Sequence, residues 1–171
     1  MSGFLNIVVR GTALLWTLLI TALIGNVIAS DNDAASSARA AVNFTMFVAV
    51  LSWIVCLYGI ASSFISALGR PIIILPLDIL GVLFTFINAI VLAAKLRAVN
   101  CSHPGNVPSN WIGYGASDVE KRCREIQAST AFMWFLWVCL CGGLFFSFSE
   151  SRSPFSGSMR SSRPNMSQVG V

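Results

Sequence analysis

The sequence predicts an all-α integral membrane protein, built as a bundle of four transmembrane helices. Of its 171 residues, 56% are hydrophobic and only 11% are charged, whereas a soluble domain usually carries about 25% charged residues. A chain with so few charges has little with which to cover a water-facing surface. It also contains four apolar runs long enough to cross a bilayer, which takes about 20 residues. These runs are residues 11–29, 42–68, 71–94 and 128–148.

The first run, residues 11–29, has features of both a membrane span and a signal peptide. Arg10 precedes it, and the triplet VIA before Ser30 suits cleavage by a signal peptidase. The apolar core of a signal peptide, however, is typically only about 7–15 residues long. Because this run is longer, we expect a retained span.

The second and third runs form a tight antiparallel hairpin, because only Gly69 and Arg70 join them. Pro71 then stands at the first helical position, where proline is well tolerated. The other two connections are the longer loops 30–41 and 95–127. With four spans, both loops lie on one side of the membrane and both termini on the other.

Cysteines are the better guide to orientation, since basic residues are nearly balanced between the two sides and the positive-inside rule makes no choice. Cys101 and Cys123 lie near the two ends of the loop 95–127. They could close this loop as a disulfide, which persists only outside the cytosol; the alternative is two unrelated reduced thiols. We therefore expect both loops outside and both termini in the cytosol. Asn100 opens an N-C-S glycosylation triplet, but it lies against the membrane boundary, and we favour a chance match.

Asp78 is the one charged residue within the run 71–94. It lies about 10 Å into the membrane, at a helical rise of 1.5 Å per residue. An isolated carboxylate at this depth is unfavourable, so we expect it to be protonated or hydrogen-bonded to hydroxyls at similar depth, those of Thr17, Ser62 and Ser63. The competing hypothesis is a proton or cation transport site. A single acid with no second ionisable group makes a poor relay, so we favour a packing role.

Small residues in the spans predict close helix packing. Gly59, Ser63 and Ala67 recur every four residues in the second span, and Gly142 and Gly143 are adjacent in the fourth. Such spacing lets two helices approach closely in lipid. It argues for a compact bundle and for no particular chemistry.

No enzyme constellation is expected. His103 is the one histidine of the chain, so a histidine-based triad and a multi-histidine metal site have no support. The sequence also has no glycine-rich phosphate-binding loop. We expect no catalytic residue, cofactor or metal.

The segment 149–171 is rich in serine, glycine, proline and arginine, a composition typical of disorder. Its arginines are expected to be attracted to an anionic inner leaflet, and phosphorylation of the adjacent serines would oppose that attraction, as in an electrostatic switch. The alternative is a solvated tail with no switch. The residues concerned are Arg152, Ser153, Arg160, Ser162 and Arg163.

Three stretches carry a family resemblance: "PLDILGVLFTF" around Asp78, "RCREIQASTAFMWF" from Arg122, and "SQV" at Ser167–Val169. The spans, the loop lengths and the pair of loop cysteines resemble those of a MARVEL domain. More narrowly, the three stretches together with Cys101 resemble the fungal non-classical export protein 2 group. The resemblance covers nearly the whole chain, and the "RCR…QA…AF" pattern is its most specific part. It implies a four-helix membrane module.

The resemblance also implies a function that composition does not. Members of the group reside in furrow-like plasma-membrane domains shared with eisosomes, respond to sphingolipid status and depend on their C-terminal tail. The chain is accordingly expected to be a non-enzymatic membrane organiser. Its expected partners are sphingolipid- and sterol-rich lipids, the anionic inner leaflet, membrane-domain scaffold proteins and further copies of itself, and not nucleic acid. The isolated arginines of this tail depart from the dense basic cluster of the group.

Two other functions stay open at the level of the sequence. One is a small proton- or cation-coupled transporter or channel that uses Asp78. The other is a cargo adaptor in unconventional secretion, for which the loop 95–127 would supply the contact surface.

Overall fold

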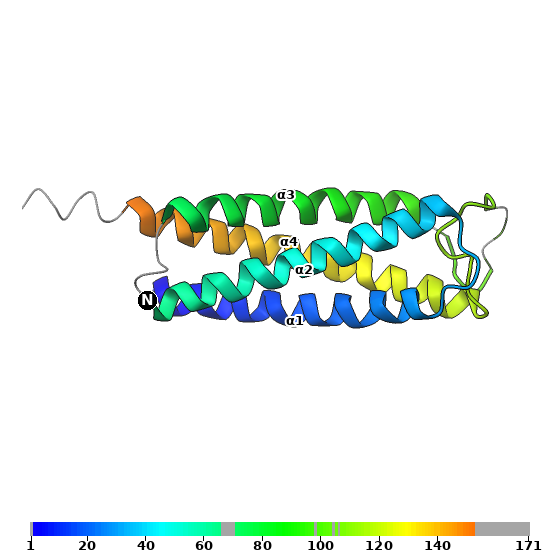
Figure 1. The fold of residues 1–171 in the computed structure, drawn as a ribbon, viewed down its shortest axis with the longest axis horizontal. Helices are drawn as coiled ribbons and strands as arrows, with labels where there is room; N and C mark the ends of the chain where they lie inside the picture. The colour runs from blue at the N-terminus through cyan, green and yellow to red at the C-terminus, as the bar shows by residue number, and fades with distance from the viewer. Residues whose placement is uncertain (1, 66–70, 98, 104, 106, 153–171) are drawn as a thin grey trace, which may run out of the picture.

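The computed structural model describes residues 2–152 except 66–70, 98, 104 and 106. This part of the chain forms four long helices in the order α1 to α4 (Figure 1). By length and composition, each of the four is able to cross a membrane. The predicted all-α, four-span fold is therefore confirmed. The helices are α1 Ser2–Ala29, α2 Ser36–Phe64, α3 Pro71–Leu96 and α4 Val119–Arg152.

The helices form a closed ring of neighbours. In it α1 packs against α2 and α4, and α3 packs against the same two helices, while within the described residues no close backbone contact joins the diagonal pairs. The start of α1 and the end of α4 lie at one end of the bundle, and the two longer connections lie at the other (Figure 1). The core between the helices is apolar, with Ile20, Ile24, Leu92, Met133 and Leu136 almost fully buried.

All four helices are longer than the apolar runs that predicted them, although α2 ends at Phe64, before the predicted residue 68. α1 begins at Ser2, so Arg10 lies inside the helix and not at its edge. α4 begins at Val119, within the predicted loop 95–127. The side chain of Asp118 accepts a hydrogen bond from the backbone N–H of Lys121 (2.9 Å), an N-cap that starts α4 before its apolar part begins.

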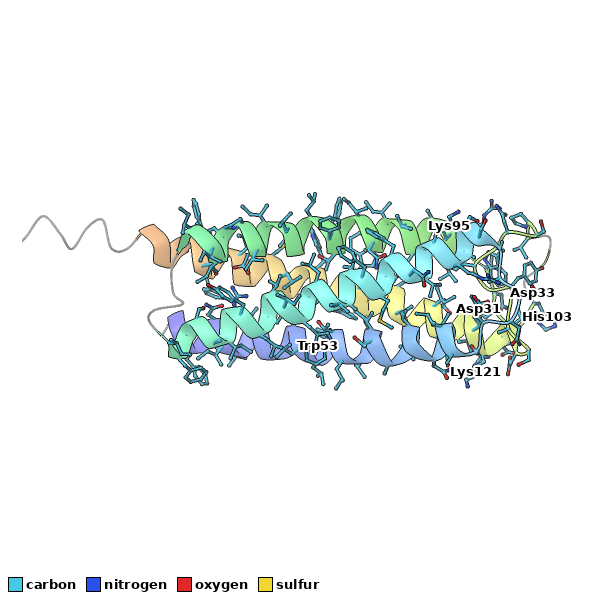
Figure 2. The ribbon with its side chains drawn as sticks, viewed as in Figure 1. Asp31, Asp33, Trp53, Lys95, His103 and Lys121 are labelled. Atoms are coloured by element: carbon cyan, nitrogen blue, oxygen red, sulfur yellow. A yellow bond between two sulfur atoms is a disulfide. The ribbon has the colours of Figure 1, made fainter. Side chains whose placement is uncertain are left out.

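The loops at the far end fold into a small cap. Figure 2 shows Asp31, Asp33, Lys95, His103 and Lys121 gathered at this end of the bundle. The backbone N–H of Asn32 donates to the carbonyl of Gly115 (2.8 Å), which joins the two loops. Gly115 has a φ of +103°, and a Cβ there would lie 2.5 Å from the Cα of Ala34. Only glycine fits this contact.

The cap is anchored to the bundle by three buried groups. The indole Nε1 of Trp111 donates to the carbonyl of Leu96 at the end of α3 (2.8 Å), and the ring is almost fully buried. Arg122 donates through Nε to the carbonyl of Ile112 (3.2 Å). The structure pairs Cys101 and Cys123 in a disulfide, with their Cα atoms 5.6 Å apart, which ties the loop after α3 to the first turns of α4.

Candidate functional site

The buried polar groups of the bundle centre on Asp78, and its partner is Arg10. Arg10 Nη2 lies 2.7 Å from Asp78 Oδ2, and Nη1 lies 3.1 Å from Oδ1. Two parallel bonds between a guanidinium and a carboxylate form the strong bidentate pair. The two residues are only 2% and 3% exposed, so the pair is shielded on all sides by protein.

The other polar atoms of Arg10 are also engaged. Its Nε donates to Asn6 Oδ1 (3.1 Å) and its Nη1 also donates to the carbonyl of Val55 (3.3 Å). Ser147 Oγ accepts from Arg10 Nη2 (3.0 Å) and donates to Asp78 Oδ2 (2.8 Å). We call Asn6, Arg10, Asp78 and Ser147 the polar cluster. With the carbonyl of Val55, it joins all four helices in the half of the bundle nearest the termini.

Such a cluster enforces one arrangement of the helices more than it adds net stability. Removing two charges from water is expensive, and a buried ion pair repays that expense only with good geometry and further hydrogen bonds. Here both carboxylate oxygens and all three guanidinium nitrogens have partners. Displacing α1 or α3 would leave a charge unpaired at membrane depth, and displacing α2 or α4 would remove a hydrogen bond from the pair. We therefore infer that the cluster fixes the register of the helices.

The three hydroxyl groups that were expected to bond Asp78 bond to the backbone of their own helices instead. Thr17 donates to the carbonyl of Ala13 (2.8 Å). Ser62 and Ser63 both donate to the carbonyl of Gly59 (2.8 Å and 3.2 Å). Serine and threonine in helices commonly bond to the backbone one turn earlier, and this local bond satisfies each hydroxyl before it can reach another helix.

The sequence analysis missed Arg10 because it stands at the edge of the apolar run that predicted the first span. The premise that Asp78 has no second ionisable group at membrane depth is therefore wrong. A signal was present in the sequence: Asn6 and Arg10 are four residues apart, on one face of a helix, and the residues between them are apolar. The apolar pattern thus continues upstream of Arg10.

The small residues near the polar cluster make room for a side chain. A Cβ on Gly59 would lie 2.2 Å from Cζ of Arg10, and one on Gly143 would lie 3.8 Å from the same atom. A Cβ on Gly142 would make an ordinary contact of 3.5 Å with Val9, where α4 packs on α1. Gly59 therefore forms the notch that receives the guanidinium. Ser63 is exposed, and Ala67 lies outside the described residues.

We expect Gly59→Ala to lower the free energy of unfolding by about 1–3 kcal/mol, the usual range for overpacking. The added methyl would displace the guanidinium of Arg10 from Asp78. Thermal unfolding of the purified protein in detergent measures the change. Gly25→Ala is the matched control, because its Cβ would meet only Met46 Cε at 3.9 Å. A loss of stability no larger than that of the control would contradict the notch.

Two further hydrogen bonds join helices closer to the cap. Thr45 Oγ1 on α2 lies 3.0 Å from Asn88 Oδ1 on α3, and both side chains are fully buried. Trp53 Nε1 on α2 donates to Thr21 Oγ1 on α1 (3.2 Å). Interhelical bonds of this kind are each modest in a membrane, on the order of 1 kcal/mol. These two bonds hold α2 to α3 and to α1 at a level between the polar cluster and the cap.

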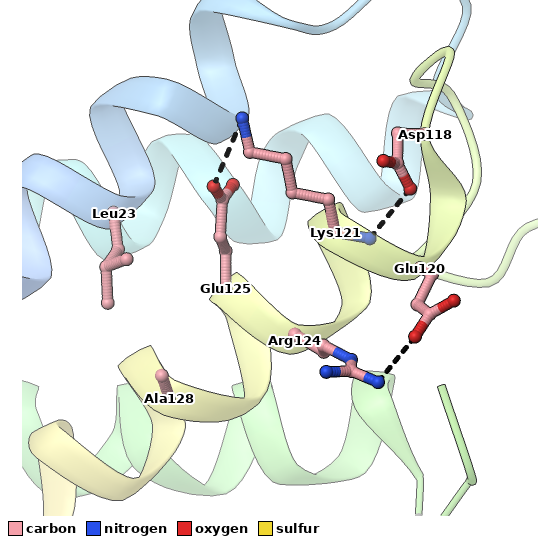
Figure 3. Close-up of a pocket in the computed structure, with 7 residues that line it drawn as sticks. All are labelled: Leu23, Asp118, Glu120, Lys121, Arg124, Glu125 and Ala128. Carbon is pink, nitrogen blue, oxygen red and sulfur yellow. Dashed lines mark hydrogen bonds and ion pairs between the residues drawn. The ribbon is translucent and has the colours of Figure 1, made fainter. Parts of the chain in front are cut away.

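A hollow of about 410 Å³ lies at the cap end between α1 and α4. Figure 3 shows two pairs of opposite sign among its charged side chains, and Asp118, which accepts from the backbone N–H of Lys121. Lys121 Nζ lies 3.9 Å from Glu125 Oε1, and Arg124 pairs with Glu120 one turn apart. Glu125 also accepts from Asn26 on α1 (2.6 Å). These charges satisfy one another, and within the described part of the chain no three potential ligands cluster to hold a metal ion. The lining is Leu23, Asp118, Glu120, Lys121, Arg124, Glu125 and Ala128.

The remaining predicted residues are placed only in part. Asn100 is exposed beside the disulfide, and its side chain accepts from the backbone N–H of Ser102 (3.2 Å); its glycosylation stays a prediction. Arg152 is the last residue of α4, and its side chain lies outside the described part of the structure. Ser153, Arg160, Ser162 and Arg163 lie outside the described residues.

Comparison with known proteins agrees with this architecture. The family model for MARVEL, a membrane-associating domain, matches residues 3–146. The chain is 34% identical over 133 residues to "Non-classical export protein 2" of Saccharomyces cerevisiae, which covers 76% of this chain and 75% of that protein. It is 39% identical over 95 residues to "Non-classical export protein 2 homolog 1" of the same yeast, covering 55% and 53% of the two chains.

A third relative is "Non-classical export protein 102" of Candida albicans, 36% identical over 90 residues, or 49% of this chain and 51% of that one. No solved structure matches the chain. The matched residues 3–146 contain Asn6, Arg10 and Asp78 and nearly all of the four helices. The chain therefore belongs to the MARVEL domain family and, within it, to the non-classical export protein 2 family of multi-pass membrane proteins.

Proposed function

We propose that the protein is a non-enzymatic organiser of plasma-membrane microdomains. It acts through its lipid-facing helix surfaces, through association with scaffold proteins and further copies of itself, and through a cytosolic C-terminal tail. The observation that carries this proposal is the polar cluster, in which the two charged groups that the described residues place at membrane depth, Arg10 and Asp78, hold the bundle together. The charges of the spans are thus internal, and large apolar side chains are exposed on the outward faces.

The resemblance to the non-classical export protein 2 group supports the finer part of the proposal. It favours furrow-like domains of the plasma membrane, shared with eisosomes, and a response to sphingolipid status. The disulfide at the cap supports the orientation, because such a bond persists outside the cytosol. The cap then faces outward, and the termini and the tail face the cytosol.

The alternative of a transport site at Asp78 is less well supported by the same geometry. Both carboxylate oxygens already accept bonds, from Arg10 and from Ser147. A proton or cation would have to displace an arginine that is itself buried. Flux through liposomes that depends on Asp78 would favour transport over organisation.

Removal of the last six residues tests the proposed function. We expect the full-length protein to be distributed in patches in the plasma membrane and the truncated protein to lose that pattern, because members of the group depend on their C-terminal tail. Fluorescence microscopy of tagged protein in fungal cells measures the distribution. The matched control replaces the same six residues with their scrambled sequence, which preserves length and composition. A uniform distribution of the full-length protein would refute the proposal.

A further inference from the structure

An apolar groove runs along the outer face of the bundle between α3 and α4. It consists of two hollows, of about 290 Å³ and 430 Å³, that adjoin each other at Ile79 and Leu144, which line both. The first hollow is lined by Ile79, Val82, Leu83, Phe86, Trp137 and Leu144. The second is lined by Leu75, Ile79, Cys141, Leu144, Phe145 and Phe148.

The two walls of the groove have the same helical spacing. On α3 the lining residues run from Leu75 to Phe86, and on α4 from Trp137 to Phe148, each at positions i, i+4, i+7, i+8 and i+11. The helices are antiparallel neighbours (Figure 1), so Phe148 and Leu75 lie at the end nearest the termini. Eleven residues at 1.5 Å each give a length of about 16 Å, close to half of the hydrocarbon core of about 30 Å. The groove thus has about the length of one leaflet.

We propose that this groove binds one acyl chain of a phospholipid from the leaflet on the side of the termini. In a membrane, hydrocarbon must fill a hollow of this length, because an empty hollow forfeits the dispersion contacts of its lining. Every lining side chain is hydrocarbon or aromatic except the thiol of Cys141. The carboxyl end of the chain lies near Phe148 and its methyl end near Trp137.

The shape of the groove favours a flexible chain over a rigid ring system. Ile79 and Leu144 stand between the two hollows and line both. An acyl chain passes such a point by rotation about its single bonds, which have three staggered minima. The fused rings of a sterol have no such freedom.

The same dimensions disfavour a helix from a second copy. α3 and α4 pack directly against each other, and helices in contact are about 8–10 Å apart. A third helix is about 10–12 Å wide with its side chains, so its backbone would rest on the rims and only single side chains could enter the hollow. The groove is also bordered by exposed, bulky side chains such as Phe145 and Leu83, which favours a thin occupant. The inference gives a location to the lipid contacts of the proposed function, and for its biological meaning it rests on that function.

Photocrosslinking in vesicles tests the groove. The full-length protein is reconstituted in phosphatidylcholine vesicles with a trace of phosphatidylcholine that carries a diazirine either near the carboxyl end or near the methyl end of one acyl chain. Mass spectrometry locates the labelled residues. The first probe should label Leu75 and Phe148, and the second should label Phe86 and Trp137. Both should label the groove more strongly than Leu57, a residue of α2 that is exposed to lipid.

Variants at one depth of α4 make the test specific. Cys141→Trp fills the groove and should lower labelling of Leu144 about tenfold, which corresponds to about 1.4 kcal/mol of binding free energy. Val138→Trp is the matched control, because Val138 is 60% exposed on the same helix and lines neither hollow; it should leave the labelling unchanged. If Cys141→Trp prevents folding, Cys141→Leu takes its place. The positions labelled in the unmodified protein then still test whether an acyl chain lies in the groove.

Three results would overturn the inference: labelling spread evenly over the groove and Leu57, stronger labelling of the groove by a sterol probe than by the acyl probes, or crosslinks from the groove to a second copy of the protein. Each is independent of the tail truncation, which tests the distribution in cells. A negative crosslinking result would therefore not refute the proposed function. A negative truncation result would not refute the binding of an acyl chain in the groove.

Discussion

Replacement of Asp78 with leucine is expected to lower the free energy of unfolding by about 3–5 kcal/mol, because it leaves a buried charge without its partner. Arg10 is 2% exposed and donates two hydrogen bonds to Asp78. Without the carboxylate, the guanidinium keeps only neutral acceptors at Asn6, Val55 and Ser147. Thermal unfolding in detergent, followed by tryptophan fluorescence, measures the loss.

The double variant Arg10→Met/Asp78→Leu separates a pairing effect from simple damage at either position. It removes both charges and replaces them with apolar side chains, an exchange that is often neutral or stabilising for buried pairs. We expect it to recover most of the stability lost in the single variant. The pairing would be refuted if the stability losses of the two substitutions added up in the double variant. It would also be refuted if Asp78→Leu were as stable as the unmodified protein.

The second large effect is expected from loss of the disulfide. Cys101 and Cys123 close a loop with a sequence separation of 22. The chain-entropy relation gives about 3 kcal/mol for a loop of this length, within the usual range of 2–5 kcal/mol for natural disulfides. We expect Cys101→Ser to lower the unfolding temperature in detergent. A reductant should produce the same shift in the unmodified protein.

A free cysteine supplies the control for the disulfide. Cys139→Ser removes a thiol that takes part in no disulfide, so this variant should keep the sensitivity to reductant, whereas Cys101→Ser should lose it. Accessibility of the two cap cysteines in intact cells, before and after reduction, also tests the orientation. An unmodified protein that reductant does not destabilise would contradict a stabilising role for the bond.

Much of the fold was available from the sequence because a membrane imposes a simple rule on it. A helix must present about 20 apolar residues to cross hydrocarbon and must satisfy its own backbone. Four such runs therefore predicted four helices, and the link between the second and third predicted their antiparallel order. The helix ends were less predictable. α4 starts within the predicted loop because Asp118 caps it, and no apolar pattern marks that turn.

The polar cluster was predictable only in part. The rule that an intramembrane acid needs a partner singled out Asp78 correctly, but it could not choose between a hydroxyl and a cation. The chosen hydroxyls bond to their own helices, and the actual partners are 68 and 69 positions away in the sequence, at Arg10 and Ser147. Arg10 flanks the apolar run of the first span in the sequence, but it lies inside α1 because the helix begins at Ser2.

The sequence by itself determined the class of this protein, its four spans, the pair of loop cysteines and the importance of one acid, because each of these depends on composition or on local spacing. Only the tertiary structure decided that Arg10 neutralises Asp78, that Gly59 makes room for it, and that α3 and α4 leave a groove between them. The physical reason is that these features arise where side chains from different helices meet. Which side chains meet depends on the rotation and register of each helix in the bundle, and no local pattern encodes those.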